Sequence, residues 1–185
     1  MKKFIIAVIL TIVSFHITQA QRMLSGQKGL EIGGGLLSKS IKRDYFYNIT
    51  LSVHTKGGSY WIWRAEYNHQ FSDYRGLQIP LETYTGEIGY SIKLLSNPRK
   101  NLALNGGLTA VAGYEMINKG DSLLFDGAKI LSQDNFIYGA GFDLSLETYI
   151  SDRIVFLLHG RSKLIWGTDL KLFRPSAGIG LRFNF

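Results

Sequence analysis

The last eleven residues of the chain, PSAGIGLRFNF at positions 175–185, decide the fold. Every second residue is apolar, and the residues between them are small or polar. Counted back from the end, the larger apolar residues are Phe185, Phe183, Leu181 and Ile179. Such alternation predicts a β-strand with one apolar and one polar face. A water-soluble domain usually ends in poorly ordered residues. The apolar face of this terminal strand must instead contact something apolar, either a second sheet or lipid.

The beginning of the chain has the three-part layout of a secretory signal peptide. Met1-Lys2-Lys3 is basic, residues 4–13 are apolar, and Thr18-Gln19-Ala20 offers small residues before a cleavage site. The apolar run is far shorter than the roughly 20 residues of a membrane-spanning helix. We therefore predict a signal peptide at residues 1–20 and an exported domain at residues 21–185, with an uncleaved anchor as the alternative.

The composition favours strands held together without disulfides. The chain has no cysteine, 13% aromatic residues, 21 glycines and only 3 prolines. The formal net charge is +7, of which Lys2 and Lys3 leave with the signal peptide. The remaining basic residues are scattered singly, so they do not predict a nucleic-acid patch.

Alternation with a period of two recurs along the mature chain and predicts eight strands. The predicted strands are residues 30–37, 45–55, 61–71, 84–94, 102–116, 136–150, 154–166 and 173–185. Most have ten or more residues, which matches the roughly 9–11 that a tilted strand needs to cross a bilayer. Strands of soluble proteins are typically nearer five or six residues.

The connections between these strands differ in length. Residues 56–59, 96–101 and 151–153 form short turns, whereas 38–44, 72–83 and 118–134 are longer; the last connection, 167–171, is again brief. An even number of strands joined by alternating short and long connections is typical of outer-membrane barrels.

The charged side chains lie on one face of the predicted strands. That face carries Glu31, Arg64, Glu66, Glu87, Lys93, Glu115, Asp143, Glu147, Arg161, Lys163, Arg174 and Arg182, together with His159. The other face is apolar, with aromatic residues near its ends, as lipid contact requires. We predict an all-β, eight-stranded antiparallel up-and-down transmembrane β-barrel of the outer-membrane type; a secreted soluble barrel with an apolar core is the alternative.

In this fold the apolar residues Ile179, Leu181, Phe183 and Phe185 form a C-terminal barrel signature on the lipid-facing side. The interior of an eight-stranded barrel is just wide enough for its own side chains. Buried charges must then be paired, so we expect the twelve charged residues to form a structural ion-pair lattice. We expect inward glycines such as Gly35 and Gly178 to make room for long arginines. A selective pore is the alternative, and a single copy cannot thread nucleic acid.

The sequence holds no clear catalytic motif, cofactor motif or metal-ligand spacing, so we predict that the protein is not an enzyme and needs no cofactor. His159 and Ser162 invite comparison with outer-membrane lipid A hydrolases. However, positions 159 and 162 differ in parity and face opposite sides of a regular strand.

Several stretches resemble the conjugative transposon protein TraO family. They are residues 79–90 (IPLETYTGEIGY), 93–96 (KLLS), 110–115 (AVAGYE), 123–128 (LLFDGA), 146–153 (LETYISDR) and 164–167 (LIWG), in the same order and with similar spacing. The resemblance implies an outer-membrane component of a conjugative DNA-transfer apparatus, related to type IV secretion, in a Gram-negative bacterium. It provides no catalytic or ligand-binding residues.

Taken together, the resemblance and the barrel prediction suggest a structural anchor or docking piece in contact with outer-membrane lipid. Its other partners would be conjugation proteins, reached through the outer loops or the periplasmic end. Leu123, Leu124 and Phe125 are apolar residues in the otherwise polar segment 118–134, which makes them candidates for a partner-binding loop; folding over the barrel mouth is the alternative. A generic OmpX-like surface barrel for adhesion or envelope stability is a second functional hypothesis, and a lipid A modifying enzyme is a third.

Overall fold

The computed structural model describes residues 24–37, 43–74, 77–99, 101–118, 134–168 and 170–185. The predicted signal peptide lies outside these residues. The strands are β1 (Lys28–Leu37), β2 (Tyr45–His54), β3 (Tyr60–Tyr74), β4 (Leu77–Ser96), β5 (Leu102–Ile117), β6 (Asp134–Tyr149), β7 (Ile154–Trp166) and β8 (Phe173–Asn184), with a short 3₁₀ turn, η1 (Lys56–Gly58), between β2 and β3. No helix in the described part of the chain is long and apolar enough to cross a membrane.

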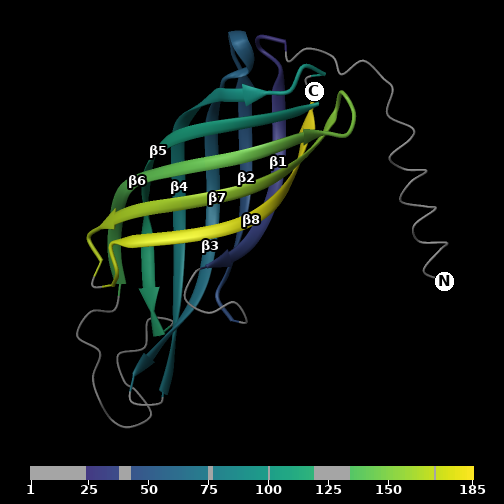
Figure 1. The fold of residues 1–185 in the computed structure, drawn as a ribbon. Helices are drawn as coiled ribbons and strands as arrows, with labels where there is room; N and C mark the ends of the chain where they lie inside the picture. The colour runs from purple at the N-terminus through teal and green to yellow at the C-terminus, as the bar shows by residue number, and fades with distance from the viewer. Residues whose placement is uncertain (1–23, 38–42, 75–76, 100, 119–133, 169) are drawn as a thin grey trace, which may run out of the picture.

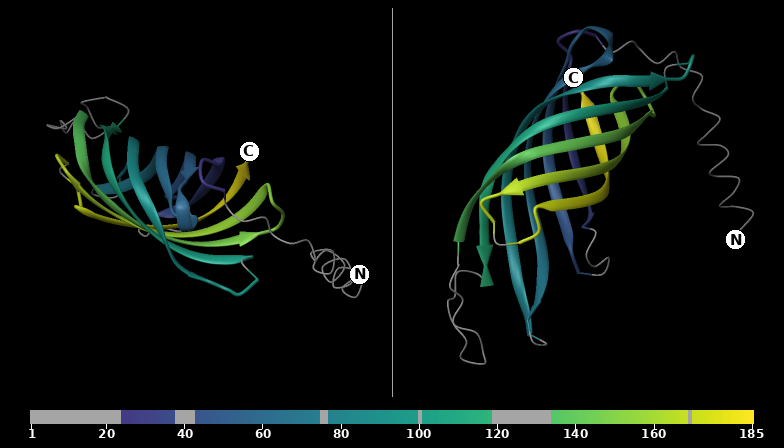
Figure 2. Two further views of the ribbon diagram at one scale, coloured as in Figure 1. Left: turned by 90° about the horizontal axis from the view of Figure 1, so that it is seen from above. Right: turned by 60° about the vertical axis from the view of Figure 1, so that its left-hand side comes forward.

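The eight strands form a closed antiparallel barrel in which each strand pairs with the next and β8 pairs with β1. The predicted up-and-down barrel is therefore confirmed. Figures 1 and 2 show the strands wrapping steeply around the barrel, so that the front and back walls cross. Closure is completed at the terminus, where the backbone N–H groups of Phe185 and Lys28 each donate to the other residue's carbonyl, at 2.8 and 3.1 Å.

The stagger of the strands follows from their register. From Leu37 the paired inward-facing residues are Ser176, Arg161, Asp143, Gly107, Ser91, Tyr60 and His54. The His54 N–H then donates to the carbonyl of Gln27, back on the line of β1 and ten residues before the start. A stagger of ten over eight strands gives a tilt of about 40°, so each residue advances about 2.5 Å along the barrel axis.

The two ends of the barrel differ. The short-turn end holds the connections after β2, β4 and β6 together with the C-terminus, at the top of Figure 1. The long-loop end holds the connections after β1, β3, β5 and β7. The arrangement agrees with the predicted alternation of short and long connections in every case but one.

The exception is the segment 72–83, which we expected to be a loop. It continues β3 to Tyr74 and β4 from Leu77, so that only residues 75–76 separate the two strands. β2 reaches only Tyr45, which pairs with His69, and β5 ends at Ile117, which pairs with Leu81. The two-stranded ribbon beyond these pairs projects from the long-loop end (Figures 1 and 2). Pro80 is tolerated there because, among the described residues, the pairing of β5 with β4 ends at Leu81 and Ile117 and does not require the missing N–H.

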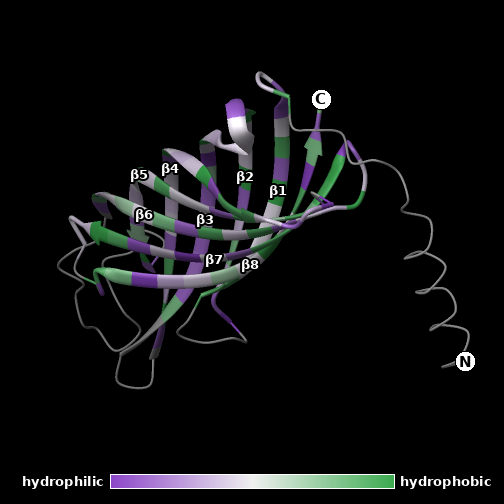
Figure 3. Ribbon diagram, turned by 45° about the horizontal axis from the view of Figure 1, so that its top comes forward, coloured by the Kyte–Doolittle hydropathy of each residue, from purple (hydrophilic) through white to green (hydrophobic). Residues whose placement is uncertain are grey.

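Hydrophilic and hydrophobic residues alternate along the strands (Figure 3), and the alternating burial places the polar ones in the interior and the apolar ones on the outward face. Leu108, Phe136 and Phe185 are 69%, 65% and 70% exposed, whereas the charged Glu115 and Glu147 are fully buried. Val111, Ile137 and Ile165 form a small apolar cluster inside the barrel. This distribution is the reverse of that in a soluble barrel.

Aromatic residues form two belts on the outward face. On three strands the belts are ten residues apart: Trp61 and Phe71 on β3, Phe156 and Trp166 on β7, and Phe183 and Phe173 on β8. The first residue of each pair belongs to the short-turn belt and the second to the long-loop belt. At about 2.5 Å per residue the belts are separated by about 25 Å along the axis.

Two of the inward glycines, Gly35 and Gly178, lie beside a phenylalanine and not beside an arginine. A Cβ atom on Gly35 or Gly178 would lie 2.8 or 2.7 Å from the ring of Phe46. The glycines therefore make room for this buried phenylalanine, and the Arg161 guanidinium stacks on its ring with Cζ 4.3 Å from the centroid.

Candidate functional site

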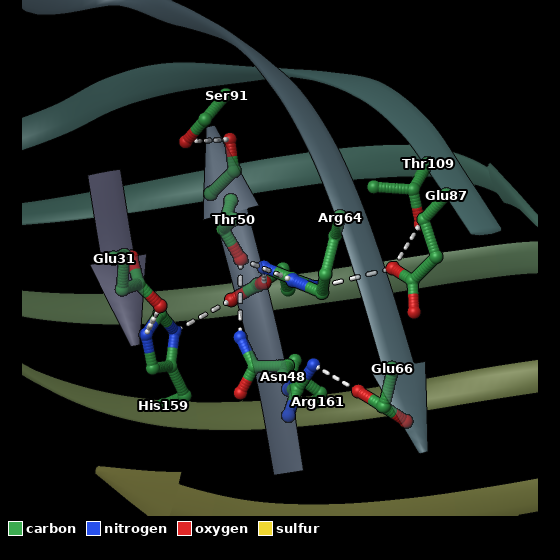
Figure 4. Close-up of polar contacts among 12 residues, drawn as sticks. Glu31, Asn48, Thr50, Arg64, Glu66, Glu87, Ser91, Thr109, His159 and Arg161 are labelled. Carbon is green, nitrogen blue, oxygen red and sulfur yellow. Dashed lines mark hydrogen bonds and ion pairs between the residues drawn. The ribbon is translucent and has the colours of Figure 1, made fainter. Parts of the chain in front are cut away.

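In the described part of the barrel, every strand except β2 supplies charged side chains to interior ion pairs, and those of β1, β3, β4, β6, β7 and β8 form one connected network. Inward-facing positions on a strand are two residues apart. Charged residues at such positions on neighbouring strands can therefore meet inside the lumen. Figure 4 shows the central part of this network.

Arg64 on β3 is the hub of the central part. Its Nη1 lies 3.1 Å from Glu87 Oε2 and its Nη2 lies 2.5 Å from Asp143 Oδ2, while Nε donates to the Thr50 hydroxyl at 3.1 Å. All five guanidinium donors of an arginine lie in one plane, so a single Arg64 ties β2, β4 and β6 together across the lumen.

A second group joins β3 and β7 nearer the long-loop end. Glu66 accepts from Arg161 Nη1 at 2.6 Å and from Lys163 Nζ at 2.7 Å. Lys163 Nζ also lies 2.5 Å from Glu87 Oε1, which connects this group to Arg64. These side chains are almost completely removed from solvent, so each charge depends on its partners.

Arg182 on β8 occupies the short-turn end of the lumen. Its Nη2 lies 3.0 Å from Glu147 Oε1 and 3.4 Å from Glu31 Oε2. The hydroxyls of Tyr60 and Tyr149 donate to the two oxygens of Glu147 at 2.8 and 2.6 Å. Arg182 also packs over the ring of Tyr60, with Cζ 4.6 Å from the centroid.

His159 links the end group to the centre. Its Nε2 lies 3.0 Å from Glu31 Oε1 and its Nδ1 lies 3.3 Å from Asp143 Oδ1. A neutral imidazole has a single N–H, so only the imidazolium form donates to both carboxylates. The connected network has five carboxylates, on Glu31, Glu66, Glu87, Asp143 and Glu147, and four other cations, on Arg64, Arg161, Lys163 and Arg182. A charged His159 therefore makes the network neutral.

A separate pair closes the mouth at the long-loop end. Glu115 Oε2 lies 2.8 Å from Arg174 Nη2, and the Thr168 hydroxyl donates to Glu115 Oε1 at 2.6 Å. Arg174 also donates to this hydroxyl at 2.9 Å. Of the twelve residues that the sequence assigns to the interior lattice, eleven form interior ion pairs.

Lys93 is the exception, because the described residues offer no ion pair to its side chain. It pairs with the inward-facing Asn105, and the register between β4 and β5 shifts only after it, between Lys93 and Leu95, which marks a β-bulge. Lys93 is exposed, and its side chain lies over the turn at Gly58. Alternation therefore gives the correct face for Lys93, but it does not show that this position lies beside an exposed turn and has no carboxylate partner among the described residues.

A small cavity lies among the charged and polar side chains of the interior. It has a volume of about 20 Å³ and lies beside Glu66 and Lys163. Asn68 and Thr83 line it, and each has a buried side-chain oxygen without a hydrogen-bond partner among the described residues. Roughly 10–15 Å³ suffices for one water molecule, so the cavity has room for a water that satisfies these oxygens.

The remaining predicted residues divide into two groups. Ile179, Leu181, Phe183 and Phe185 all face outward on or after β8, and their exposed fractions range from 37% to 70%. Leu123, Leu124 and Phe125 lie outside the described residues.

Sequence reasoning missed the tyrosines that complete the interior network. Tyr60 lies one residue before the predicted strand, and Tyr149 lies near a strand end where alternation is weak. Tyr60 lies an even number of residues from Arg64 on the same strand, so alternation could have placed it on the inward face. Ser162 faces outward and His159 inward, as parity predicts.

Comparison with known proteins gives the chain a family. A model of the family described as "Conjugative transposon protein TraO" matches residues 24–185. The chain belongs to the TraO family of conjugative transposon proteins. The resemblance noted in the sequence is therefore confirmed. No curated protein sequence matches this TraO-family chain.

Among solved structures, the barrel resembles the N-terminal β-barrel domain of OprF from Pseudomonas aeruginosa. The TM-score is 0.51 with 13% sequence identity, and the similarity covers 87% of this chain and 98% of the OprF domain. At this identity the likeness shows the fold alone. It agrees with a TraO-family chain built as one eight-stranded barrel.

Proposed function

We propose that this protein is an outer-membrane component of a conjugative DNA-transfer apparatus, acting as a structural anchor or docking piece without a catalytic role. Membership of the TraO family supports the link to conjugative transfer. The similarity to the OprF barrel supports a fold suited to the outer membrane. The role as an anchor is our inference from the geometry of the two faces.

The observation that carries the proposal is the outward apolar band between the two aromatic belts. Its height of about 25 Å equals that of the apolar band of outer-membrane barrels. A closed barrel leaves no unpaired strand edge in lipid. Trp61, Trp166 and Phe173 are about half exposed, and aromatic rings at this height suit the membrane–water interfaces. The short-turn end would then face the periplasm.

The filled interior limits what a single copy can do. The ion pairs of Arg64 and Glu66 cross the lumen between opposite strands, so no described path is wide enough for a nucleic-acid strand. Contacts with other transfer proteins would use the long-loop end or the short-turn end. The segment 118–134 with Leu123, Leu124 and Phe125 stays a candidate for such a contact.

The contacts of His159 inside the barrel agree with a structural role. Both nitrogens of His159 are occupied by carboxylates, and Ser162 lies on the opposite face of β7. Such an arrangement offers no histidine base to this serine, which a hydrolase would need.

Membrane placement can be tested by expressing the full chain and separating the cell envelope. We expect the protein in the outer-membrane fraction and a shift of its gel mobility on boiling. A protein recovered from the soluble periplasm would contradict the placement. The transfer role is tested by deleting the gene in a donor cell, where transfer should fall and return with a plasmid copy.

Deleting residues 120–132 tests the loop contact separately. Transfer frequency should fall while the heat-dependent mobility shift persists. Unchanged transfer would remove this loop from the docking role without affecting the barrel placement. A location of the gene away from other transfer genes would favour a generic surface barrel.

A further inference from the structure

Glu82 is a charged residue on the outward face of the barrel, which otherwise carries apolar and uncharged side chains between the two aromatic belts in the described strands. In the described strands, Glu82 on β4 and His69 on β3 are the only acidic, basic or histidine side chains that face outward between the two aromatic belts. Their backbones are directly paired. Both lie at the level of the long-loop belt, which holds Phe71 and Trp166.

Aromatic rings surround this carboxylate. The rings of Tyr67 and Tyr84 lie 5.1 Å apart, and their hydroxyls face the same side chain. Tyr45 stacks on His69 at 5.2 Å between centroids. Together Tyr45, Tyr67, His69, Glu82 and Tyr84 form what we call the Glu82 cluster.

The carboxylate of Glu82 has no lysine or arginine partner among the described residues. Its contacts are with the hydroxyls of Tyr67 and Tyr84, the latter at 3.4 Å, and with His69 Nδ1 at 3.9 Å. That nitrogen has no hydrogen-bond partner in the described structure. By contrast, the six carboxylates of the interior ion pairs each have a partner within 3.0 Å, for example 2.6 Å for Glu66 and 2.5 Å for Glu87. The half-buried Glu82 therefore has room for an additional cationic partner.

We propose that the Glu82 cluster binds the ammonium group of a lipid headgroup in the outer leaflet. A single carboxylate supplies the complementary charge, and the faces of Tyr45, Tyr67 and Tyr84 attract a cation through their ring quadrupoles. The position at the long-loop belt matches the depth of headgroups, because the belts delimit the hydrocarbon. This inference rests on the proposed membrane placement.

The test uses the refolded full-length mature chain in phosphatidylglycerol vesicles with or without added phosphatidylethanolamine. Both lipids carry a phosphodiester and acyl chains, and they differ in the ammonium group. After extraction into detergent, native mass spectrometry counts the lipids that stay bound. We expect phosphatidylethanolamine to be retained about fivefold over phosphatidylglycerol, and Glu82→Gln to abolish this preference.

Tyr138→Phe is the matched control. Tyr138 is an exposed tyrosine in the long-loop belt on β6, at a distance from any outward carboxylate, and its replacement should leave the preference unchanged. Tyr84→Leu removes one ring of the cluster and should reduce the preference. Retention that is equal for the two lipids, or that survives Glu82→Gln, would overturn the inference.

The same samples separate this inference from the membrane placement. If the chain inserts into vesicles and shifts on boiling but shows no headgroup preference, the Glu82 cluster is not an ammonium site and the placement stands. If the chain fails to insert into either vesicle, both the placement and the inference that rests on it are wrong.

Discussion

The substitution Glu66→Leu should lower the free energy of unfolding of the barrel by more than most substitutions of surface residues. In Glu66→Leu, Lys163 keeps Glu87 at 2.5 Å. Arg161 loses its carboxylate at 2.6 Å, and no other carboxylate of the described residues lies within ion-pair distance of it. Its guanidinium, whose side chain is only 3% exposed, is then buried without a counter-charge. Breaking a buried pair in this way costs about 3–5 kcal/mol.

A double-mutant cycle isolates the pair. Arg161→Met removes the cation and keeps its apolar length, so the double variant Glu66→Leu/Arg161→Met leaves no unpaired charge at this position. Replacement of a whole buried pair by apolar residues is often close to neutral. We expect the double variant to be more stable than Glu66→Leu alone, with a coupling energy of at least about 2 kcal/mol.

Equilibrium urea unfolding in lipid vesicles provides the measurement. The three tryptophans, Trp61, Trp63 and Trp166, all face outward, so their fluorescence reports loss of the membrane environment. With a slope of about 2 kcal/mol per molar urea, the midpoint of Glu66→Leu should fall by about 2 M. A loss below about 1 kcal/mol, or additive single effects, would refute the reasoning because it would mean that water screens these charges.

Four further outcomes are expected. Gly35→Ala places a Cβ 2.2 Å from the Ala177 carbonyl oxygen and should prevent β1–β8 closure, seen as loss of the heat-dependent mobility shift, whereas Gly160→Ala, with nothing within 4 Å, should fold normally. Deleting Phe185 removes two closing hydrogen bonds and should lower the folded fraction on refolding, while Phe185→Leu should not. His159→Leu removes the donor of one oxygen of Glu31 and one oxygen of Asp143 and leaves the network with a net negative charge, so it should lower the free energy of unfolding by about 3 kcal/mol, with His159→Gln intermediate. The wild-type chain in planar bilayers should show no discrete conductance steps, and steady steps would contradict a filled lumen.

Much of the fold could be predicted from the sequence because a barrel strand obeys one simple rule. Successive side chains face opposite sides, so the alternation around Arg64, Asp143 and Arg182 was enough to assign them inward. The same rule correctly separated His159 from Ser162. No other feature of the fold is encoded so locally.

Partnerships and strand ends could not be predicted in the same way. Arg64 and Asp143 are 79 residues apart in sequence, and they meet only because of the stagger between strands, which alternation does not encode. The segment 72–83 was predicted to be a connection, yet most of it extends β3 and β4, where Pro80 is compatible with an unpaired ribbon edge. The bulge beside Lys93 reversed the parity of the residues after it.

Interior and outward charges therefore have different explanations. Inside, five carboxylates, four other cations and His159 satisfy one another, so the lumen needs no ligand to account for its ions. Outside, the membrane placement makes any charge costly, and the cost depends on depth. Glu82 lies where this cost is small, and it contacts Tyr67, Tyr84 and His69 but no lysine or arginine of the described residues. The interior network does not include Glu82, so the proposed headgroup contact is the explanation to test for this charge at the long-loop belt.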